Sequence, residues 1–330
     1  MTSRLRLAAA AVLATTTLGF GPAALAEPSR PECVAPAQPG GGFDLTCRLA
    51  QTALADGSVL KAPLRISYMP GGVGAVAYNN IITQRPAEAG TIVAFSGGSL
   101  LNLAQGKFGK YTVDDVRWLA VIGADYGAVI VRKDSPYKDL KDLAAALKAD
   151  PTKVVFGAGG TVGSQDWMKA ALVARAAGIS HRSMRFVAFE GGGEGIAALQ
   201  GGHVHVYSGD ASEAASQIKA GANIRVLAVM ADKRLPGDLA DVPTAKEQGF
   251  DVEWPIVRGF YMGPKVSDEA YKAWVEAFNR MMRTPEFAKL REERGLYAYS
   301  LTGPTLDTFV KRTTQGYRKA AEEFGLAGAK

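Results

Sequence analysis

Five glycine clusters in the chain each follow a short apolar run and precede a segment of helical periodicity. They lie at 40–42, 71–74, 97–98, 157–163 and 191–193. Glycine lets backbone N–H groups approach a ligand closely, and the N-terminus of the following helix favours an anion. A single such cluster can equally well be a tight turn without a ligand. Five clusters together indicate that at least some of them line a site for an anionic ligand.

Other chemistries fit the residues less well. Ser164 opens a helix after a glycine turn, which suits a nucleophile but equally a helix cap or a ligand hydroxyl, and no serine lies in a G-x-S-x-G turn. His203 and His205 share one face of an expected strand and could hold a metal together with Asp210 or Glu190, although ordinary surface or core histidines are the simpler interpretation. We therefore predict a protein that is not an enzyme and that binds no metal.

A nucleotide cofactor is also not expected. The segment 72–77 matches G-x-G-x-x-A after an apolar run, but the next apolar run, which ends at Phe95, carries no acid for a ribose. The pair Gly106-Lys107 lacks the leading glycine and the following hydroxyl residue of a phosphate-binding loop. No cofactor is predicted.

These glycine turns must be positioned by a sheet. Apolar runs at 33–36, 64–69, 91–95, 154–156 and 186–189 are expected strands, and each is followed by a glycine turn and a helix. Strands that alternate with helices predict an α/β protein with largely parallel sheets, in which ligands gather beyond the carboxyl ends of the strands. The amphipathic segments 267–283 and 305–324 are expected to be packing helices.

The first 26 residues have the features of a secretory signal peptide. Arg4 and Arg6 precede an apolar run, and Ala24-Leu25-Ala26 is a cleavage pattern that no cysteine follows. We expect an exported, periplasmic protein without a lipid anchor. Its net charge falls from +6 to +4 on cleavage, and no block of lysine and arginine indicates nucleic-acid binding.

The two cysteines of the chain, Cys33 and Cys47, both lie in the mature part. An oxidising compartment favours a disulfide between them, which would stabilise the fold by about 3 kcal/mol. Two buried thiols are the alternative.

Several motifs resemble, in order along the mature chain, the receptors of tripartite tricarboxylate transporters, the TctC or Bug family. They are PGGGFD at 39–44, PGGVG at 70–74, GS at 163–164, EGGG at 190–193, LQGGHV at 199–204, and the stretch from LAV at 227–229 through RLP at 234–236 to VPTAKEQG at 242–249. The segment 32–47 resembles the citrate-binding branch of that family.

The resemblance implies a bilobed periplasmic-binding-protein fold, type II-like, whose lobes are joined by two crossover strands. We expect the first lobe to comprise 27–128 and 230–330 and the second lobe 129–229, with hinges near 126–131 and 226–231. The family holds a carboxylate between loops of the two lobes. Matched residue by residue, the ligand-binding positions implied are Gly41, Gly42, Phe43 and Asp44 in one loop, Thr161, Gly163 and Ser164 in the opposing loop, and in addition Gly191, Gly192 and Asp210.

Asp44 suits a helix cap or a water-orienting acceptor, paired with Arg48, better than direct contact with an anion. Arg258 is the candidate cation for a further carboxylate, and an interlobe salt bridge is its equally good alternative. The remaining candidate ligand contacts are the hydroxyl and amide groups of Ser96, Ser99 and Asn102, and Tyr126 at the hinge.

The function implied is a monomeric receptor that closes around citrate or a related tricarboxylate and delivers it to a membrane permease. Two alternatives stay open from the sequence. One is an exported hydrolase of a carboxylate substrate with Ser164 as nucleophile, and the other is a sensor that reports its ligand to a signalling partner.

Overall fold

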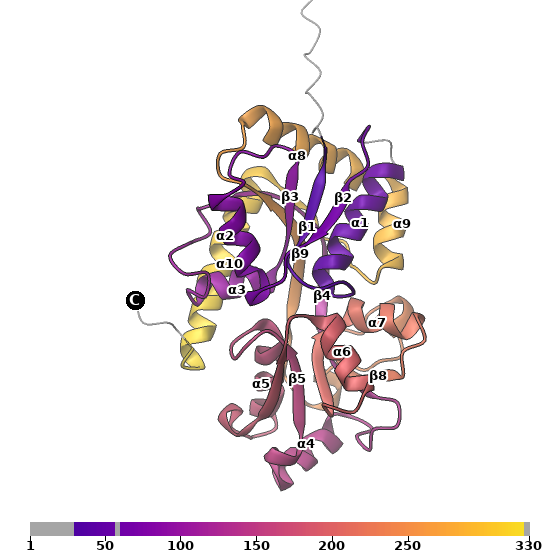
Figure 1. The fold of residues 1–330 in the computed structure, drawn as a ribbon. Coiled ribbons are helices and arrows are strands. Elements are labelled where there is room, and N and C mark those ends of the chain that lie inside the picture. Colours follow the sequence, from indigo (N-terminus) through magenta and orange to yellow (C-terminus); the bar gives the residue numbers. More distant parts are fainter. Residues whose placement is uncertain (1–29, 57–59, 327–330) are drawn as a thin grey trace, which may run out of the picture.

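The computed structural model describes residues 30–56 and 60–326, so the expected signal peptide at 1–26 lies outside the described residues. The described chain forms two lobes, each built on a sheet with helices on both faces (Figure 1). The long strand β4, Arg117–Arg132, passes through both sheets. The α/β bilobed fold predicted from the glycine-turn pattern and the family resemblance is confirmed.

The sheet of the first lobe has the order β2-β1-β3-β9-β4-β10. Strands β1, β2 and β3 are parallel, and β9 runs antiparallel between β3 and β4. Besides the first half of β4, its strands are β1 (Glu32–Ala35), β2 (Arg65–Tyr68), β3 (Thr91–Ser96), β9 (Pro255–Met262) and β10 (Leu301–Thr302). The carboxyl ends of the parallel strands therefore point toward the second lobe, as Figure 1 shows.

Two layers of helices cover this sheet. Apolar side chains of α1 (Gly42–Asp56), α8 (Asp268–Met282) and α9 (Pro285–Glu293) form one core with one face of the sheet. Those of α2 (Ala75–Thr83), α3 (Gly97–Ala104) and α10 (Gly303–Glu323) form a second core on the other face. In α8, the expected stripe of Trp274, Phe278 and Met281 is buried, and the side chain of Ser267 caps the helix.

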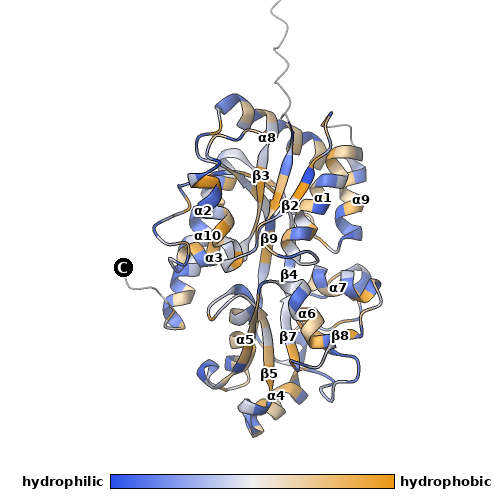
Figure 2. Ribbon diagram, in the orientation of Figure 1, coloured by the Kyte–Doolittle hydropathy of each residue, from blue (hydrophilic) through white to orange (hydrophobic). Residues whose placement is uncertain are grey.

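The second lobe repeats this plan with a smaller sheet of order β6-β5-β7-β4-β8. Its strands besides β4 are β5 (Val155–Gly159), β6 (Arg185–Phe189), β7 (Val206–Asp210) and β8 (Ile224–Met230). The helices are α4 (Leu140–Ala149) and α5 (Gln165–Ala176) on one face, and α6 (Gly192–Gln200) and α7 (Ala211–Lys219) on the other. Figure 2 shows the hydrophobic residues concentrated on the strands and on the helix faces that cover them.

The chain crosses between the lobes later than we expected on its return. The first crossing is at Tyr126 and Gly127, where β4 changes its neighbours from β9 to β7 and β8. After β8, however, Val229 donates a hydrogen bond to the carbonyl of Pro243, and Trp254 packs in the core of the second lobe. Residues 231–254 therefore lie with the second lobe and not with the first, and the return crossing is at Trp254 and Pro255.

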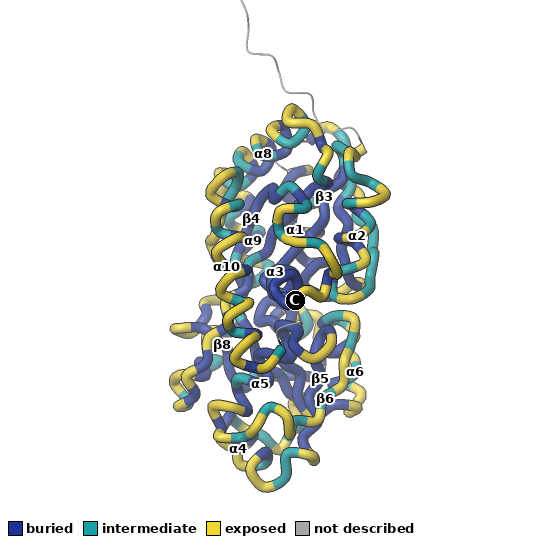
Figure 3. Tube along the Cα trace, turned by 90° about the vertical axis from the view of Figure 1, so that its left-hand side faces the viewer, coloured by how far each residue is buried: buried dark blue, intermediate teal, exposed yellow. Residues whose placement is uncertain are grey.

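Helix α10 connects the lobes in addition to these strands. Leu306 and Val310 are buried in the first lobe, whereas Phe324 at the end of the helix contacts Trp167 of the second lobe, with ring centroids 6.3 Å apart. Figure 3 shows α10 running along one side of the molecule with its outer face exposed. The expected packing helix at 305–324 is thus present and extends over both lobes.

Cys33 on β1 and Cys47 on α1 form a disulfide, with Cα atoms 5.8 Å apart. The prediction of a disulfide is confirmed over that of two buried thiols. The disulfide fixes α1 to the strand before it, and the turn between these two elements carries the first glycine cluster. Among the described residues, no helix is both long and apolar enough to cross a membrane.

Candidate ligand site between the lobes

Glycine loops of the two lobes meet at the base of the cleft. The loop before α1 lies against the loop before α6 so closely that a Cβ on Gly193 would be 2.7 Å from the carbonyl oxygen of Pro39. A Cβ on Gly42 would be 2.1 Å from Nη1 of Arg258. A side chain at Gly193 would therefore hold the loops apart, and one at Gly42 would displace the guanidinium of Arg258. Glycine here permits the contact between the lobes, and it leaves backbone N–H groups at the surface of the cleft.

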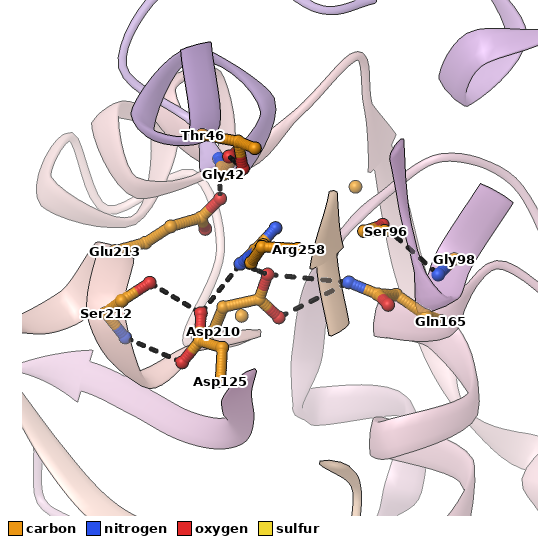
Figure 4. A network of polar contacts seen from close by, with 12 residues as sticks. Gly42, Thr46, Ser96, Gly98, Asp125, Gln165, Asp210, Ser212, Glu213 and Arg258 are labelled. Carbon is orange, nitrogen blue, oxygen red and sulfur yellow. Dashed lines mark hydrogen bonds and ion pairs between the residues drawn. The ribbon is translucent and has the colours of Figure 1, made fainter. Parts of the chain in front are cut away.

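An inner cavity of about 40 Å³ lies where these loops meet. Buried charged groups surround it, as Figure 4 shows. Among the predicted site residues, its lining includes Gly41, Gly42, Phe43, Ser96, Gly191, Gly192, Asp210 and Arg258. These predicted positions therefore lie together in the structure.

Arg258 is the centre of a buried ion network. Its Nη2 lies 2.7 Å from Asp125 of β4 and 2.5 Å from Asp210 at the end of β7. Asp210 also pairs with Lys169 of α5 at 2.6 Å, and Lys169 pairs with Asp166 at 2.7 Å. Burial opposes the charge on Asp210, but Lys169 and Arg258 together hold the pKa of this carboxyl below its ordinary value. Asp210 is therefore an ionised counter-ion between two cations.

Within this network Arg258 joins the two lobes. Its guanidinium belongs to β9 of the first lobe, while Asp210 belongs to the second lobe, so the pair is an interlobe salt bridge. This is the alternative that the sequence left open beside ligand binding. Asp125 and Asp210 already neutralise the charge of Arg258, so Arg258 attracts an anionic ligand only weakly.

Glu213 of α7 extends from the second lobe to the N-terminus of α1 in the first. The N–H of Gly42 donates a short hydrogen bond to Oε1 of Glu213 (Figure 4). Within the described part of the chain, no lysine, arginine or histidine forms an ion pair with this buried carboxyl. Burial raises its pKa well above the ordinary value, and the charge of Asp210 adds to this effect. The sequence reasoning missed Glu213, because nothing in a helical segment indicates which loop it will reach.

A larger outer cavity of about 520 Å³ opens beside the inner one. Its lining includes the predicted residues Asn102, Thr161 and Ser164 and, from the first lobe, Lys107. Lys107 Nζ donates a hydrogen bond of 2.5 Å to the carbonyl of Val162 across the cleft, and burial lowers its pKa to about 8. Oδ1 of Asn102 is buried, and no described residue forms a hydrogen bond with it. The cavity thus offers a cation and an acceptor that has no protein donor.

Comparison with known proteins decides the family. The model of the tripartite tricarboxylate transporter family receptor matches residues 49–326. The chain belongs to this family. A UPF0065 protein encoded in the gbd 5' region of Cupriavidus necator is 24% identical over 303 residues, which cover 88% of this chain and 86% of the relative.

Solved structures of similar proteins share the fold. MatC from Rhodopseudomonas palustris with bound malate has a TM-score of 0.75 at 20% identity, over 88% of this chain and 97% of that one. Another R. palustris protein, with adipate, has a TM-score of 0.79 at 18% identity, over 91% of this chain and 98% of that one. Receptors of the tripartite tricarboxylate transporter family are periplasmic and bind solutes without transforming them. This receptor is accordingly a solute-binding protein and not an enzyme.

Four predicted positions of the receptor do not line either cavity. Asp44 lies inside α1, which begins at Gly42, so it is not the helix cap that we considered. Its carboxylate instead accepts hydrogen bonds from the N–H of Gly40, from Tyr68 and from Arg48, and the predicted pair with Arg48 is confirmed at 2.9 Å. The loop is therefore held in place by Asp44.

The other three positions outside the cavities have structural contacts. Ser99 completes a capping box with Ser96 at the start of α3. Tyr126 packs edge-on against Tyr297, with ring centroids 5.5 Å apart. Gly163 presents its carbonyl oxygen across the cleft to Nε2 of Gln105 at 2.7 Å. Gly163 and Gln105 therefore join the lobes beside the outer cavity.

The hydroxyl of Ser164 caps α5 by accepting a hydrogen bond of 3.3 Å from the N–H of Trp167. The histidines have other partners. Nδ1 of His205 accepts from the N–H of Val155, and His181 packs against the ring of Trp167. Neither of these two histidines contacts the hydroxyl of Ser164. Among the described residues, no group of three histidine, cysteine, aspartate or glutamate side chains could hold a metal ion.

Proposed function

We propose that this receptor captures citrate or a related tricarboxylate in the cleft and delivers it to the membrane permease of a tripartite transporter. The outer cavity carries this proposal, because its volume of about 520 Å³ lies within the range of small-molecule sites. It also joins a cation, hydroxyl groups and backbone N–H groups from both lobes. Such a set of donors suits a solute with several carboxylates.

Within this cavity, Lys107 is the cation that would bind a carboxylate of the solute. Within the described ranges its ammonium has one hydrogen-bond partner, the carbonyl of Val162, whereas Arg258 and Lys169 are each paired with two carboxylates. Ser164 and Thr161 lie at the N-terminus of α5, where the helix dipole favours a second negative group. Two acids, Glu190 and Glu194, also line this cavity, and the carboxylate of Glu194 accepts a hydrogen bond from the N–H of Glu190.

The unpaired Oδ1 of Asn102 favours a solute that also carries a hydrogen-bond donor. Citrate differs from tricarballylate by one hydroxyl group, which can donate to such an acceptor. A buried acceptor left without a donor is unfavourable by roughly 1–3 kcal/mol, so this contact would select the hydroxylated acid. The malate in the solved MatC structure is likewise a hydroxylated carboxylic acid.

The delivery step follows from the bilobed fold. The solute would bind between the lobes, the lobes would close around it, and the closed form would dock on the permease. Cleavage of the signal peptide at 1–26 would release the receptor, as a monomer, into the periplasm.

Calorimetric titration of the mature receptor with citrate, isocitrate, tricarballylate and succinate tests the proposal. We expect stoichiometric binding, with citrate or isocitrate bound more tightly than tricarballylate and succinate. Tighter binding of succinate, or no binding of any tricarboxylate, would refute the assignment. Loss of citrate uptake on deletion of the receptor would distinguish transport from a sensing role.

A further inference from the structure

We propose that Glu213 is an internal stand-in for the carboxylate of the solute and that binding of the solute displaces it. This inference rests on the proposed function of the cleft. Glu213 is one of the buried acids of the inner cavity, yet it has no part in the ion network of Arg258, Asp210 and Lys169. Its contact is instead with the N–H of Gly42 in the other lobe.

The position of the Glu213 carboxyl is one that an anion would take. Gly42 is the first residue of α1, a helix of 15 residues, and its N–H points out of the helix N-terminus. On the other side, Oε2 of Glu213 lies so close to Gly192 that a Cβ there would be 2.0 Å from it. The carboxyl is therefore enclosed between glycine loops of both lobes. The glycine at 192 makes room for it.

Glu213 is also the acid of this cluster that can leave most easily. Asp210 is held by two cations and Asp125 by Arg258 and Ser212, whereas Glu213 is held by one backbone N–H. Opening of the cleft separates Glu213 on α7 from Gly42 on α1 without breaking an ion pair of Glu213. The free N–H of Gly42 can then donate a hydrogen bond to a carboxylate of the solute.

The small volume of the inner cavity limits which solutes can reach the N–H of Gly42. With Glu213 in place, about 40 Å³ remains there, against about 520 Å³ in the outer cavity. A solute that fills only the outer cavity leaves Glu213 where it is. A solute that also places a carboxylate on the N–H of Gly42 has to displace Glu213, so this residue sets a threshold against solutes with few carboxylates.

Gln165 also lines the inner cavity, and this residue is 9% exposed. Its Oε1 has no hydrogen-bond partner among the described residues. Its Nε2 faces Asp210 at 3.4 Å, so its unpaired oxygen is free for a donor on a bound molecule. Gln165 and Glu213 line the same cavity, so a polar solute that displaces Glu213 can also satisfy this buried acceptor.

The test compares Glu213→Ala and Glu213→Gln with wild type, and uses Glu276→Ala, on the exposed face of α8, as the matched control. Calorimetry with citrate should show binding about 3- to 10-fold tighter for Glu213→Ala, because the solute no longer competes with a hydrogen bond of the protein. Glu213→Gln keeps an acceptor for the N–H of Gly42, so its gain should be smaller. Thermal melting identifies any variant that fails to fold.

Amide hydrogen exchange tests the contact without a solute. The amide of Gly42 should exchange faster in ligand-free Glu213→Ala than in wild type, and saturating citrate should restore its protection. Unchanged exchange, or binding of citrate by Glu213→Ala that is equal to or weaker than that of wild type, overturns the inference and leaves the proposed function intact. If neither protein binds any carboxylate, the proposed function itself fails.

Discussion

The pH dependence of solute binding is the most direct test of the role of Lys107. In the receptor without solute, burial lowers the pKa of the Lys107 ammonium to about 8. A carboxylate of the solute beside this ammonium stabilises the charged form and raises that pKa. Between the two pKa values, the complex therefore holds a proton that the free receptor has lost.

The sign of the effect follows from this difference. Below a pH of about 8, Lys107 is charged in both states and contributes its full attraction to binding. Above that pH, binding of the solute takes up a proton, so the affinity falls as the pH rises, by at most about tenfold per pH unit. The fall ends above the pKa of Lys107 in the complex.

The size of the contribution can be estimated from the contact. A hydrogen bond to a charged group contributes about 1.5–3 kcal/mol, and the lower end applies because Lys107 is exposed at the rim of the cavity. Lys107→Met should therefore weaken citrate binding about tenfold at pH 7. The same variant should bind with an affinity that no longer falls above pH 8.

Isothermal titration calorimetry between pH 7 and pH 9.5, at constant ionic strength, measures both effects. Lys107→Arg keeps a charge over this range and should remove the pH dependence with a smaller loss of affinity. Lys110→Met, a change at an exposed lysine three positions further along the chain, is the matched control and should behave as wild type. An identical fall of affinity with pH in Lys107→Met and wild type would refute the assignment of this cation.

Three further predictions concern the acceptor, the ion network and the disulfide. Asn102→Ala should remove most of the preference for citrate over tricarballylate, a change of several-fold that parallel titrations would reveal, and an unchanged ratio would exclude this acceptor. Asp210→Asn leaves two buried cations short of a counter-ion and should lower the free energy of unfolding in urea by about 3–5 kcal/mol, whereas the exposed Asp232→Asn should not change it measurably. Replacing Cys33 and Cys47 together by serine should cost about 3 kcal/mol in the same assay, and equal stability with and without a reductant in wild type would contradict this.

The sequence predicted the parts of the fold that depend on local pattern. Alternation of apolar runs and glycine turns indicated the strands and the loops that line the cleft, and the motif PGGGFD marked the start of α1. Gly41, Gly42 and Gly192 were named from the resemblance of their motifs to the receptor family, and they lie together at the inner cavity. The disulfide was predictable because an exported chain with two cysteines has one possible pairing.

The remaining parts depend on contacts between distant segments. Asp125 lies within a strand and Glu213 within a helix, and neither stands out until β4, β7 and β9 are assembled side by side. The late return crossing escaped prediction because residues 231–254 contain no regular strand. They join the second lobe through apolar side chains, among them Phe250 and Trp254, and pattern does not say which core these side chains will enter.

The distribution of charge at the base of the cleft explains why anion recognition falls to few groups. The buried acids there outnumber the buried cations, as Asp125, Asp166, Asp210 and Glu213 surround Arg258 and Lys169. These cations are therefore neutralised by the protein itself, and the inner cavity attracts an anion mainly through backbone N–H groups. Lys107 shares the outer cavity with Glu190 and Glu194, but among the cations described at the two cavities it is the one without an ion pair. A solute carboxylate therefore gains net attraction at Lys107, and it gains a backbone N–H donor where Glu213 withdraws. Selection among carboxylates should accordingly change when either of these two residues is altered, and loss of Arg258 should act first on the joining of the lobes.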